Sequence, residues 1–217
     1  MAAEPMAVTV AHGGVGHARE GGISNVILGM ILFIASEVMF FAGLFAAYFN
    51  VRATAPGGWP PGDFLGKLNF LPTAEQPIPV VTLATILLIS SSVTCQVGVW
   101  GIRAGDHRKL VRAIGITVVL GATFLLMQAY DYSVLYSEGV RLDAGTFGTT
   151  YYTLTGFHGA HVLGGVIMLS VVLYRAMAGQ FSKDHHDMVE ATSIYWHFVD
   201  VVWIVLFSTL YLIPNPA

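Results

Sequence analysis

Five long apolar runs constrain this chain more than any other feature of its sequence. They lie near residues 23–49, 79–100, 113–132, 148–174 and 189–212. Each run has the roughly 20 residues that an α-helix needs to cross the hydrocarbon core of a bilayer. Only 11% of the residues are charged, against about a quarter in an ordinary soluble domain. The sequence therefore predicts an all-α integral membrane bundle of five transmembrane helices.

The segments outside these runs predict a single domain with a short tail. Residues 1–22 are rich in glycine and lack the basic start and apolar core of a signal peptide, so we expect a flexible N-terminal tail. Residues 50–79 are rich in proline and glycine, which favours an ordered surface loop over a helix. The other connections are short, so residues 23–217 are expected to form one five-helix domain.

Lysine and arginine are distributed unevenly between the segments expected on one side of the membrane and those expected on the other. With the N-terminus in the cytoplasm, most of them lie on the cytoplasmic side, namely Arg19, Arg103, Arg108, Lys109, Arg112, Arg175 and Lys183. Arg52, Lys67 and Arg141 then lie outside. Cytoplasmic segments of membrane proteins carry an excess of Lys and Arg. The pattern therefore favours a cytoplasmic N-terminus and an outer C-terminus.

Histidines gather on the same predicted face of the membrane. His12, His17, His107, His185 and His186 all lie outside the apolar runs on the cytoplasmic side. Imidazoles titrate near neutral pH, so His12, His17, His185 and His186 are candidates for a proton antenna at the membrane surface. Chance clustering explains the same pattern without a function.

The first run carries a carboxylate at its centre, in the stretch ILFIASEVMFFAGLF. A charged side chain at the bilayer centre costs about 2.5–3.5 kcal/mol on insertion scales, so Glu37 is expected to face the interior of the bundle. One interpretation is a protonated glutamate that hydrogen-bonds between helices. The other is a proton-handling or lipid-organising site, and the residues alone favour neither.

The fourth run contains the stretch TGFHGAHVLGG. Gly156, Ala160 and Gly164 recur every four residues and predict the close approach of a neighbouring helix. His158 and His161 lie beside this stripe, three residues apart. Two histidines at that spacing can share a metal, but with Glu37 alone beside them they make a weak ligand set. Buried, hydrogen-bonded histidines are the favoured interpretation.

Further polar groups lie in or beside the remaining runs. In EATSIYWHFVDVVWIVLF, Glu190 and His197 lie seven apart on one face, and His197 and Asp200 are close enough to pair across a turn. The third run ends in QAYDY, which places Asp131 near the outer interface. Arg175 ends the fourth run, where it serves as a positive-inside anchor or as a clamp on lipid phosphate.

Composition excludes several classes of function. The net charge of −3 is unlike that of a generally basic nucleic-acid binder, so no nucleic-acid partner is expected. The single cysteine, Cys95, cannot form an internal disulfide or a paired-cysteine metal site. We therefore assign no metal and no catalytic residue to this chain.

Three stretches resemble subunit III of the haem–copper terminal oxidases of the cytochrome c oxidase type: ASEVMFFAGLFAAYF, TGFHGAHVLGG and EATSIYWHFVDVVWIVLF. The resemblance runs from about residue 23 to residue 213, with the motifs in order on the expected helices. It implies a non-catalytic core subunit of an aa3-type, proton-pumping cytochrome c oxidase in a bacterial inner membrane. Partner subunits then hold the haem and copper, while this chain holds no redox cofactor and binds phospholipid.

The resemblance also implies partners and residue roles. Subunit I is the main contact, and subunit II and small extra subunits or a cytochrome bc-type supercomplex are further partners. Subunit III of this family stabilises subunit I, sustains activity through repeated turnover and supports proton uptake. Glu37 matches the family's intramembrane glutamate, and His161 and Arg175 match lipid-contacting positions. The matching positions interpreted as a structural polar network are His158, Glu190, His197, Asp200 and Asp131, the last where the family more often has Glu.

Other interpretations stay open. Many members of the family have seven helices, and without the first two this chain lacks one wall of the lipid cleft unless subunit I supplies it. A quinol oxidase has an equivalent subunit, and the electron donor binds elsewhere, so the residues barely separate the two. A haem- or metal-binding cytochrome would use His158, His161 or His197 as ligands. A stand-alone proton channel would use Glu37, His197 and Asp200. Neither of these explains the ordered match over three helices.

Overall fold

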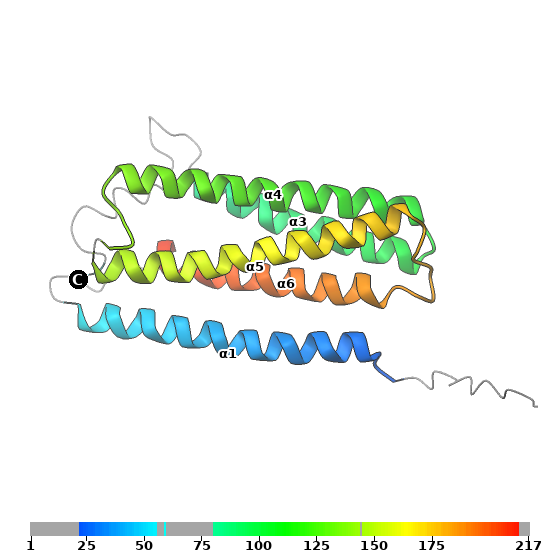
Figure 1. The fold of residues 1–217 in the computed structure, drawn as a ribbon, viewed down its shortest axis with the longest axis horizontal. Helices are drawn as coiled ribbons and strands as arrows, with labels where there is room; N and C mark the ends of the chain where they lie inside the picture. Colours follow the sequence, from blue (N-terminus) through cyan, green and yellow to red (C-terminus); the bar gives the residue numbers. More distant parts are fainter. Residues whose placement is uncertain (1–21, 56–58, 60–79, 144, 213–217) are drawn as a thin grey trace, which may run out of the picture.

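The computed structural model describes residues 22–55, 59, 80–143 and 145–212, and this part of the chain is a bundle of long helices without strands (Figure 1). The helices are α1 (Asn25–Thr54), α3 (Val80–Arg103), α4 (His107–Ser137), α5 (Thr146–Met177) and α6 (Asp187–Phe207), which a π-helical turn, η1 (Ser208–Leu212), continues. Among these described residues, five helices, with η1 counted as part of α6, are long and apolar enough to span a membrane. The predicted class of a multi-pass helical membrane protein is confirmed.

Each helix is longer than the apolar run that predicted it, α6 when η1 is counted with it. The difference is largest at α4, which has 31 residues and begins at His107 instead of at residue 113. The side chain of Asp106 caps this helix by accepting the backbone N–H of Lys109 at 2.9 Å, which satisfies one of the donors that a helix start leaves open. A helix continues into the polar interface once its end is capped, so hydropathy marks the span and not the helix ends.

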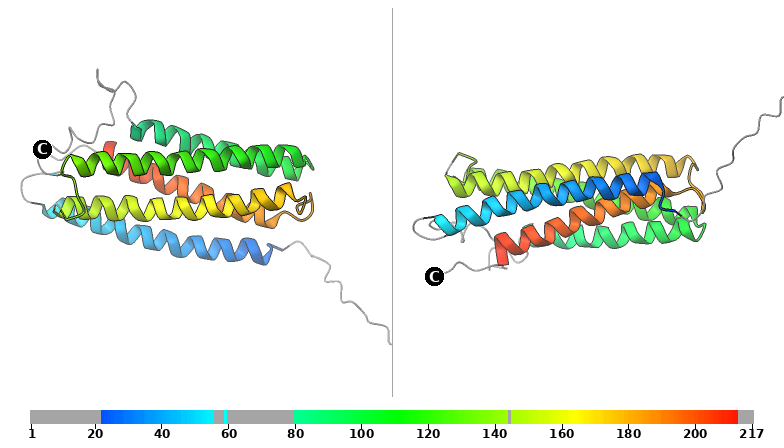
Figure 2. Two further views of the ribbon diagram at one scale, coloured as in Figure 1. Left: turned by 45° about the horizontal axis from the view of Figure 1, so that its top comes forward. Right: turned by 90° about the horizontal axis from the view of Figure 1, so that it is seen from below.

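α6 lies at the centre of the bundle, in contact with α1, α3 and α5. α4 packs against α3 and α5, whereas α1 packs against α5 and α6, so α1 and α4 lie on opposite sides of the molecule (Figures 1 and 2). Within α1 only Phe41 and Tyr48 are buried. The polar side chain of Glu37 therefore sits on the least covered helix of the bundle.

Trp196 of α6 determines how closely the neighbouring helices approach. Its side chain is buried, and its Nε1–H donates to the Ser91 hydroxyl of α3 at 3.0 Å. A Cβ atom added at Gly165 would lie 2.7 Å from the Trp196 ring, and one added at Gly121 would lie 2.6 Å from it. The indole is thus held between the backbones of α4 and α5, where only glycine leaves it room.

The predicted stripe of small residues on α5 is not where the closest contact occurs. A Cβ atom at Gly156 would meet only the Tyr132 hydroxyl at 3.8 Å, and one at Gly164 would meet the Tyr195 hydroxyl at 3.4 Å. Both distances are ordinary contacts or nearly so. The tighter contact between α5 and α6 is at Gly165, next to this stripe, because the Trp196 ring lies there.

Candidate functional site

Glu37 and His161 form a polar pair between α1 and α5. The Glu37 Oε2 and His161 Nε2 atoms are 2.9 Å apart, and the two side chains are 19% and 15% exposed. The cost of its charge predicted that Glu37 faces the bundle interior, but the contact joins positions 124 residues apart. The tertiary structure therefore supplies the partner that an intramembrane carboxylate needs.

The hydrogen bonds of His161 define how many protons the pair holds. Its Nδ1 atom lies 2.7 Å from the carbonyl oxygen of Phe157, which can only accept, so Nδ1 carries a hydrogen. The contact between Nε2 and Glu37 then requires one further proton. That proton resides either on the imidazole, which gives an ion pair, or on the carboxyl, which gives a neutral pair. In both forms the site has no net charge, which suits its position in an apolar layer.

Two aromatic rings pack against the histidine of this pair. The ring centroids of Phe41 and Phe40 lie 4.9 and 6.2 Å from that of His161, and the Tyr195 hydroxyl of α6 donates to the His161 carbonyl oxygen at 3.1 Å. Apolar surroundings strengthen a hydrogen bond because they lower the local dielectric constant. The contact between Glu37 and His161 is therefore a firm link between α1 and α5 and a place where a proton can be held.

Arg175, the third predicted lipid contact, lies apart from this pair. It is 14 residues from His161 along α5, which corresponds to about 21 Å of helix. Its guanidinium donates to Gln180 Oε1 and to the Met188 sulfur, both at 2.8 Å, and lies over the Phe181 ring at 5.1 Å. Arg175 therefore fastens the connection between α5 and α6, whether or not it also meets a lipid phosphate.

His158 faces a different helix from His161. Its side chain is fully buried, and its Nε2 atom lies 3.2 Å from the Val199 carbonyl oxygen of α6. Its ring packs against Trp203 with centroids 4.9 Å apart. The two histidines thus bind different helices, and within the described residues no group of three or more His, Cys, Asp or Glu side chains gathers in a metal-like cluster.

Two polar contacts in α6 differ from what spacing suggested. His197 Nε2 lies 3.2 Å from Gln96 Oε1 of α3, and among the described residues no ion pair joins it to Asp200. Glu190 accepts from Arg103 of α3 at 2.8 Å and lies 2.9 Å from His186 Nε2. The sequence carried no signal for the Arg103 contact, since the two residues lie 87 positions apart.

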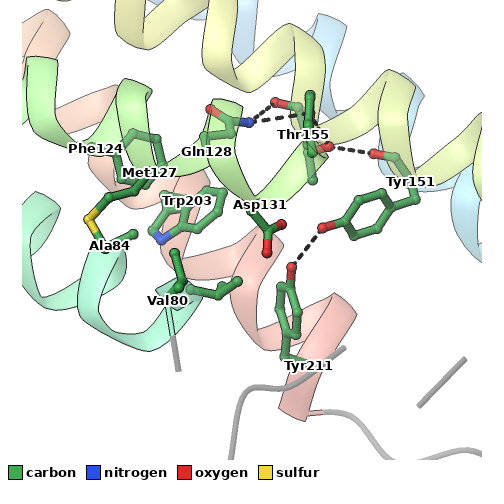
Figure 3. Close-up of a pocket in the computed structure, with 12 residues that line it drawn as sticks. Val80, Ala84, Phe124, Met127, Gln128, Asp131, Tyr151, Thr155, Trp203 and Tyr211 are labelled. Atoms are coloured by element: carbon green, nitrogen blue, oxygen red, sulfur yellow. Dashed lines mark hydrogen bonds between the residues drawn. The ribbon is translucent and has the colours of Figure 1, made fainter. Parts of the chain in front are cut away.

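Asp131 lies in a cavity near one end of the bundle (Figure 3). The hydroxyls of Tyr151 and Tyr211 are 2.8 Å apart there, and the Gln128 amide donates to the Thr155 carbonyl oxygen at 3.0 Å. The cavity has about 20 Å³ of space for the centre of a water-sized sphere. Asp131 is thus a partly buried polar group between α4, α5 and η1.

The predicted antenna histidines are described only in part. His12 and His17 lie outside the described residues. His185 is exposed in the connection between α5 and α6, whereas His186 contacts Glu190 and has its Nδ1 atom 3.2 Å from the Ser182 carbonyl oxygen. Of this described pair, His185 is therefore the one open to solvent.

Comparison with known proteins adds an independent line of evidence. The family model for "Cytochrome c oxidase subunit III" matches residues 10–214. A "Probable cytochrome c oxidase subunit 3" of Mycobacterium tuberculosis is 44% identical over 188 residues, which cover 87% of this chain and 88% of the relative. The "Cytochrome c oxidase subunit 3" of Corynebacterium diphtheriae is 43% identical over 190 residues. That of Sus scrofa is 39% identical over 188 residues, or 84% of this chain and 67% of the pig protein.

Proposed function

Because this chain belongs to the cytochrome c oxidase subunit III family, we propose that it is a non-catalytic core subunit of an aa3-type oxidase that transfers electrons from cytochrome c to oxygen. In this role it stabilises subunit I, binds phospholipid and supports proton uptake while the partner subunits carry out the redox chemistry. The single observation that carries the proposal is the Glu37–His161 pair, which places two matched family positions in one contact between α1 and the rest of the bundle.

The polar pair supports a lipid-holding role because of where it lies. α1 is the least buried helix, so much of its surface is open to lipid or to a partner subunit. The Glu37–His161 contact holds this helix to α5 without leaving a net charge in the apolar layer. A lipid beside α1 would therefore contact a helix that is held in a fixed position. The proton shared by Glu37 and His161 would stay between α1 and α5.

The proposed topology places the N-terminus in the cytoplasm and the C-terminus outside, in a bacterial inner membrane. It rests on the excess of Lys and Arg in the segments that would face the cytoplasm. The five spans act as one unit over residues 23–217. Subunit I is the main partner, and subunit II and small extra subunits or a cytochrome bc-type complex are further ones.

The arrangement of the intramembrane histidines supports placing haem and copper in the partner subunits. Each intramembrane histidine of the described chain uses one ring nitrogen in a contact with a different partner: His158 with the Val199 carbonyl, His161 with Glu37 and His197 with Gln96. A haem or copper centre needs its ligand nitrogens to converge on one metal ion. The histidines also serve different helix contacts, so they do not converge on one centre.

Affinity purification tests the assignment directly. We expect the tagged full-length chain, drawn from gently solubilised membranes, to bring along subunits with haem absorption bands, whereas the chain separated from them shows none. A co-purified subunit II with a paired-cysteine copper motif supports cytochrome c as the donor, and one without that motif supports quinol. A haem band that stays with the isolated chain would contradict the proposal.

The antenna hypothesis predicts a change in the pH profile. Replacing His12, His17, His185 and His186 together is expected to lower the turnover of the assembled oxidase most at high pH, where free protons are scarce and surface buffering groups matter most. Oxygen uptake across a pH series measures it. His185→Gln alone should have a larger effect than His186→Gln, because His185 is exposed and His186 contacts Glu190. An unchanged profile in the fourfold variant would rule the antenna out.

A further inference from the structure

The N-terminal end of α4 gathers positive charge beside three surface hollows. His107, Arg108, Lys109 and Arg112 occupy its first two turns, and the first turn contains no acidic residue. Arg112 lines all three hollows, which measure about 440, 290 and 450 Å³, and Arg108 lines two of them. The two arginines are four positions apart and therefore lie on one face of the helix.

This arrangement is electrostatically unfavourable without an anion. The N-terminal end of a helix already carries a partial positive charge, so basic side chains there repel it and negative groups are stabilising. Asp106 offers one carboxylate, which caps the helix at the backbone N–H of Lys109. The ion pairs found in the described part of the chain involve neither Arg108, Lys109 nor Arg112. The site therefore favours an anionic ligand.

An apolar groove leads away from the arginines along the same helix. The 450 Å³ hollow is lined by Arg112 and then by Gly115, Ile116, Val119 and Leu120. Ile116 and Val119 are 52% and 64% exposed, and Leu120 lies about 12 Å along the helix from Arg112. The arginines suit the phosphate of a phospholipid, and the apolar groove beside them suits its acyl chain. A free phosphate would contact only the arginines.

We propose that this end of α4 binds an anionic diacyl phospholipid. The lipid phosphate pairs with Arg108 and Arg112, and one acyl chain lies along the groove from Gly115 to Leu120. α4 and α1 lie on opposite sides of the bundle (Figure 1), so this site is separate from the Glu37–His161 pair. The inference does not depend on the proposed function or on the orientation of the chain.

Native mass spectrometry of the full-length chain with added phosphatidylglycerol tests whether Arg108 and Arg112 bind the lipid phosphate. An arginine near a phosphate surface contributes roughly fivefold to lipid affinity, so the Arg108→Gln/Arg112→Gln variant is expected to bind about 30-fold more weakly. Arg141→Gln is the matched control, because Arg141 is an exposed arginine at the other end of α4. Phosphatidylcholine should bind wild type and variants alike. Equal loss in the control, or no loss in the double variant, would overturn the proposal.

The groove is tested by a change that keeps every charge. Gly115→Leu adds a side chain where a Cβ atom would have its nearest neighbour, Leu173 Cδ1, at an ordinary 3.9 Å, so the fold should tolerate it. We expect it to weaken the binding of long-chain phosphatidylglycerol while a short-chain form with the same headgroup binds as before. Unchanged long-chain binding would show that the groove is not used.

Photocrosslinking in the assembled oxidase identifies the occupant. A photoreactive phenylalanine analogue at Ile116 is expected to give this chain a mass increase of lipid size. A product the size of another polypeptide would show that an acidic segment of a partner subunit covers the site, and that outcome would overturn the proposal, as would the absence of any product.

Discussion

Alanine in place of Gly165 is expected to destabilise the folded chain by about 3 kcal/mol, the upper part of the usual range for an overfilled core. The new Cβ atom would lie 2.7 and 2.8 Å from two atoms of the Trp196 ring. That ring cannot withdraw, because the backbone of α4 at Gly121 lies against its other edge and Ser91 binds its Nε1–H. The strain must therefore move α5 away from α6.

Gly156→Ala provides the matched control for this prediction. It makes the same chemical change on the same helix, but its Cβ atom would have its nearest neighbour, the Tyr132 hydroxyl, at 3.8 Å. We expect its stability to stay within about 1 kcal/mol of wild type, the size of the glycine-to-alanine difference in helix propensity. Unfolding of the purified chain in detergent, followed by circular dichroism, compares the two. Equal stability of both variants would show that the Trp196 contact does not limit packing.

The second large effect is expected in the working lifetime of the oxidase. Glu37→Ala, or Glu37→Ala combined with His161→Ala, should leave the initial rate of oxygen consumption within about twofold while shortening the active lifetime about tenfold. A hydrogen bond to a charged group contributes about 1.5–3 kcal/mol, and each 1.4 kcal/mol is a factor of ten in a population. Losing it lets α1 separate from α5 more often, which opens the subunit to lipid loss without touching a redox centre.

Oxygen uptake by the assembled enzyme over many turnovers measures both quantities. Glu37→Gln is the informative control, because a glutamine can still hydrogen-bond to His161 but cannot carry the proton of a carboxyl group. A near-normal lifetime in Glu37→Gln would assign the effect to the helix contact, and a short one would assign it to proton handling. An immediate loss of rate with stable residual activity would contradict the lifetime prediction.

Arg175→Ala is also expected to shorten the active lifetime of the oxidase, but through a different contact. It removes the bonds to Gln180 and Met188 that fasten the connection between α5 and α6. Arg141→Ala, which changes an exposed arginine at the other end of the bundle, should leave the lifetime unchanged.

Much of the fold was predictable because hydrocarbon imposes a simple rule on a sequence. A span must be apolar and about 20 residues long, and its backbone must satisfy its own hydrogen bonds, so five runs predict five helices. The helix ends were less predictable. α1 continues through Thr54 and α4 starts at His107, because caps and interfacial polar residues extend a helix beyond the apolar layer.

The candidate site could be predicted residue by residue but not contact by contact. Glu37, His161, His197 and Glu190 were conspicuous as polar groups in or beside apolar runs, and the resemblance to a family gave Glu37 and His161 a role. Their partners were hidden. Periodicity orients a side chain within its own helix, but says nothing about which helix faces it. Spacing therefore paired His197 with Asp200 of the same helix and gave no sign of its contact with Gln96 of α3.

The sequence by itself determined the membrane class, the five spans, the family and the polar residues that need an explanation, since each follows from composition, periodicity or a continuous motif. Only the tertiary structure decided that Glu37 meets His161, that Glu190 meets Arg103, and that basic residues of α4 stand beside an apolar groove. The physical reason is that the rotation and depth of each helix are set by close packing. For α4, α5 and α6 this packing includes the fit of the Trp196 ring between Gly121 and Gly165.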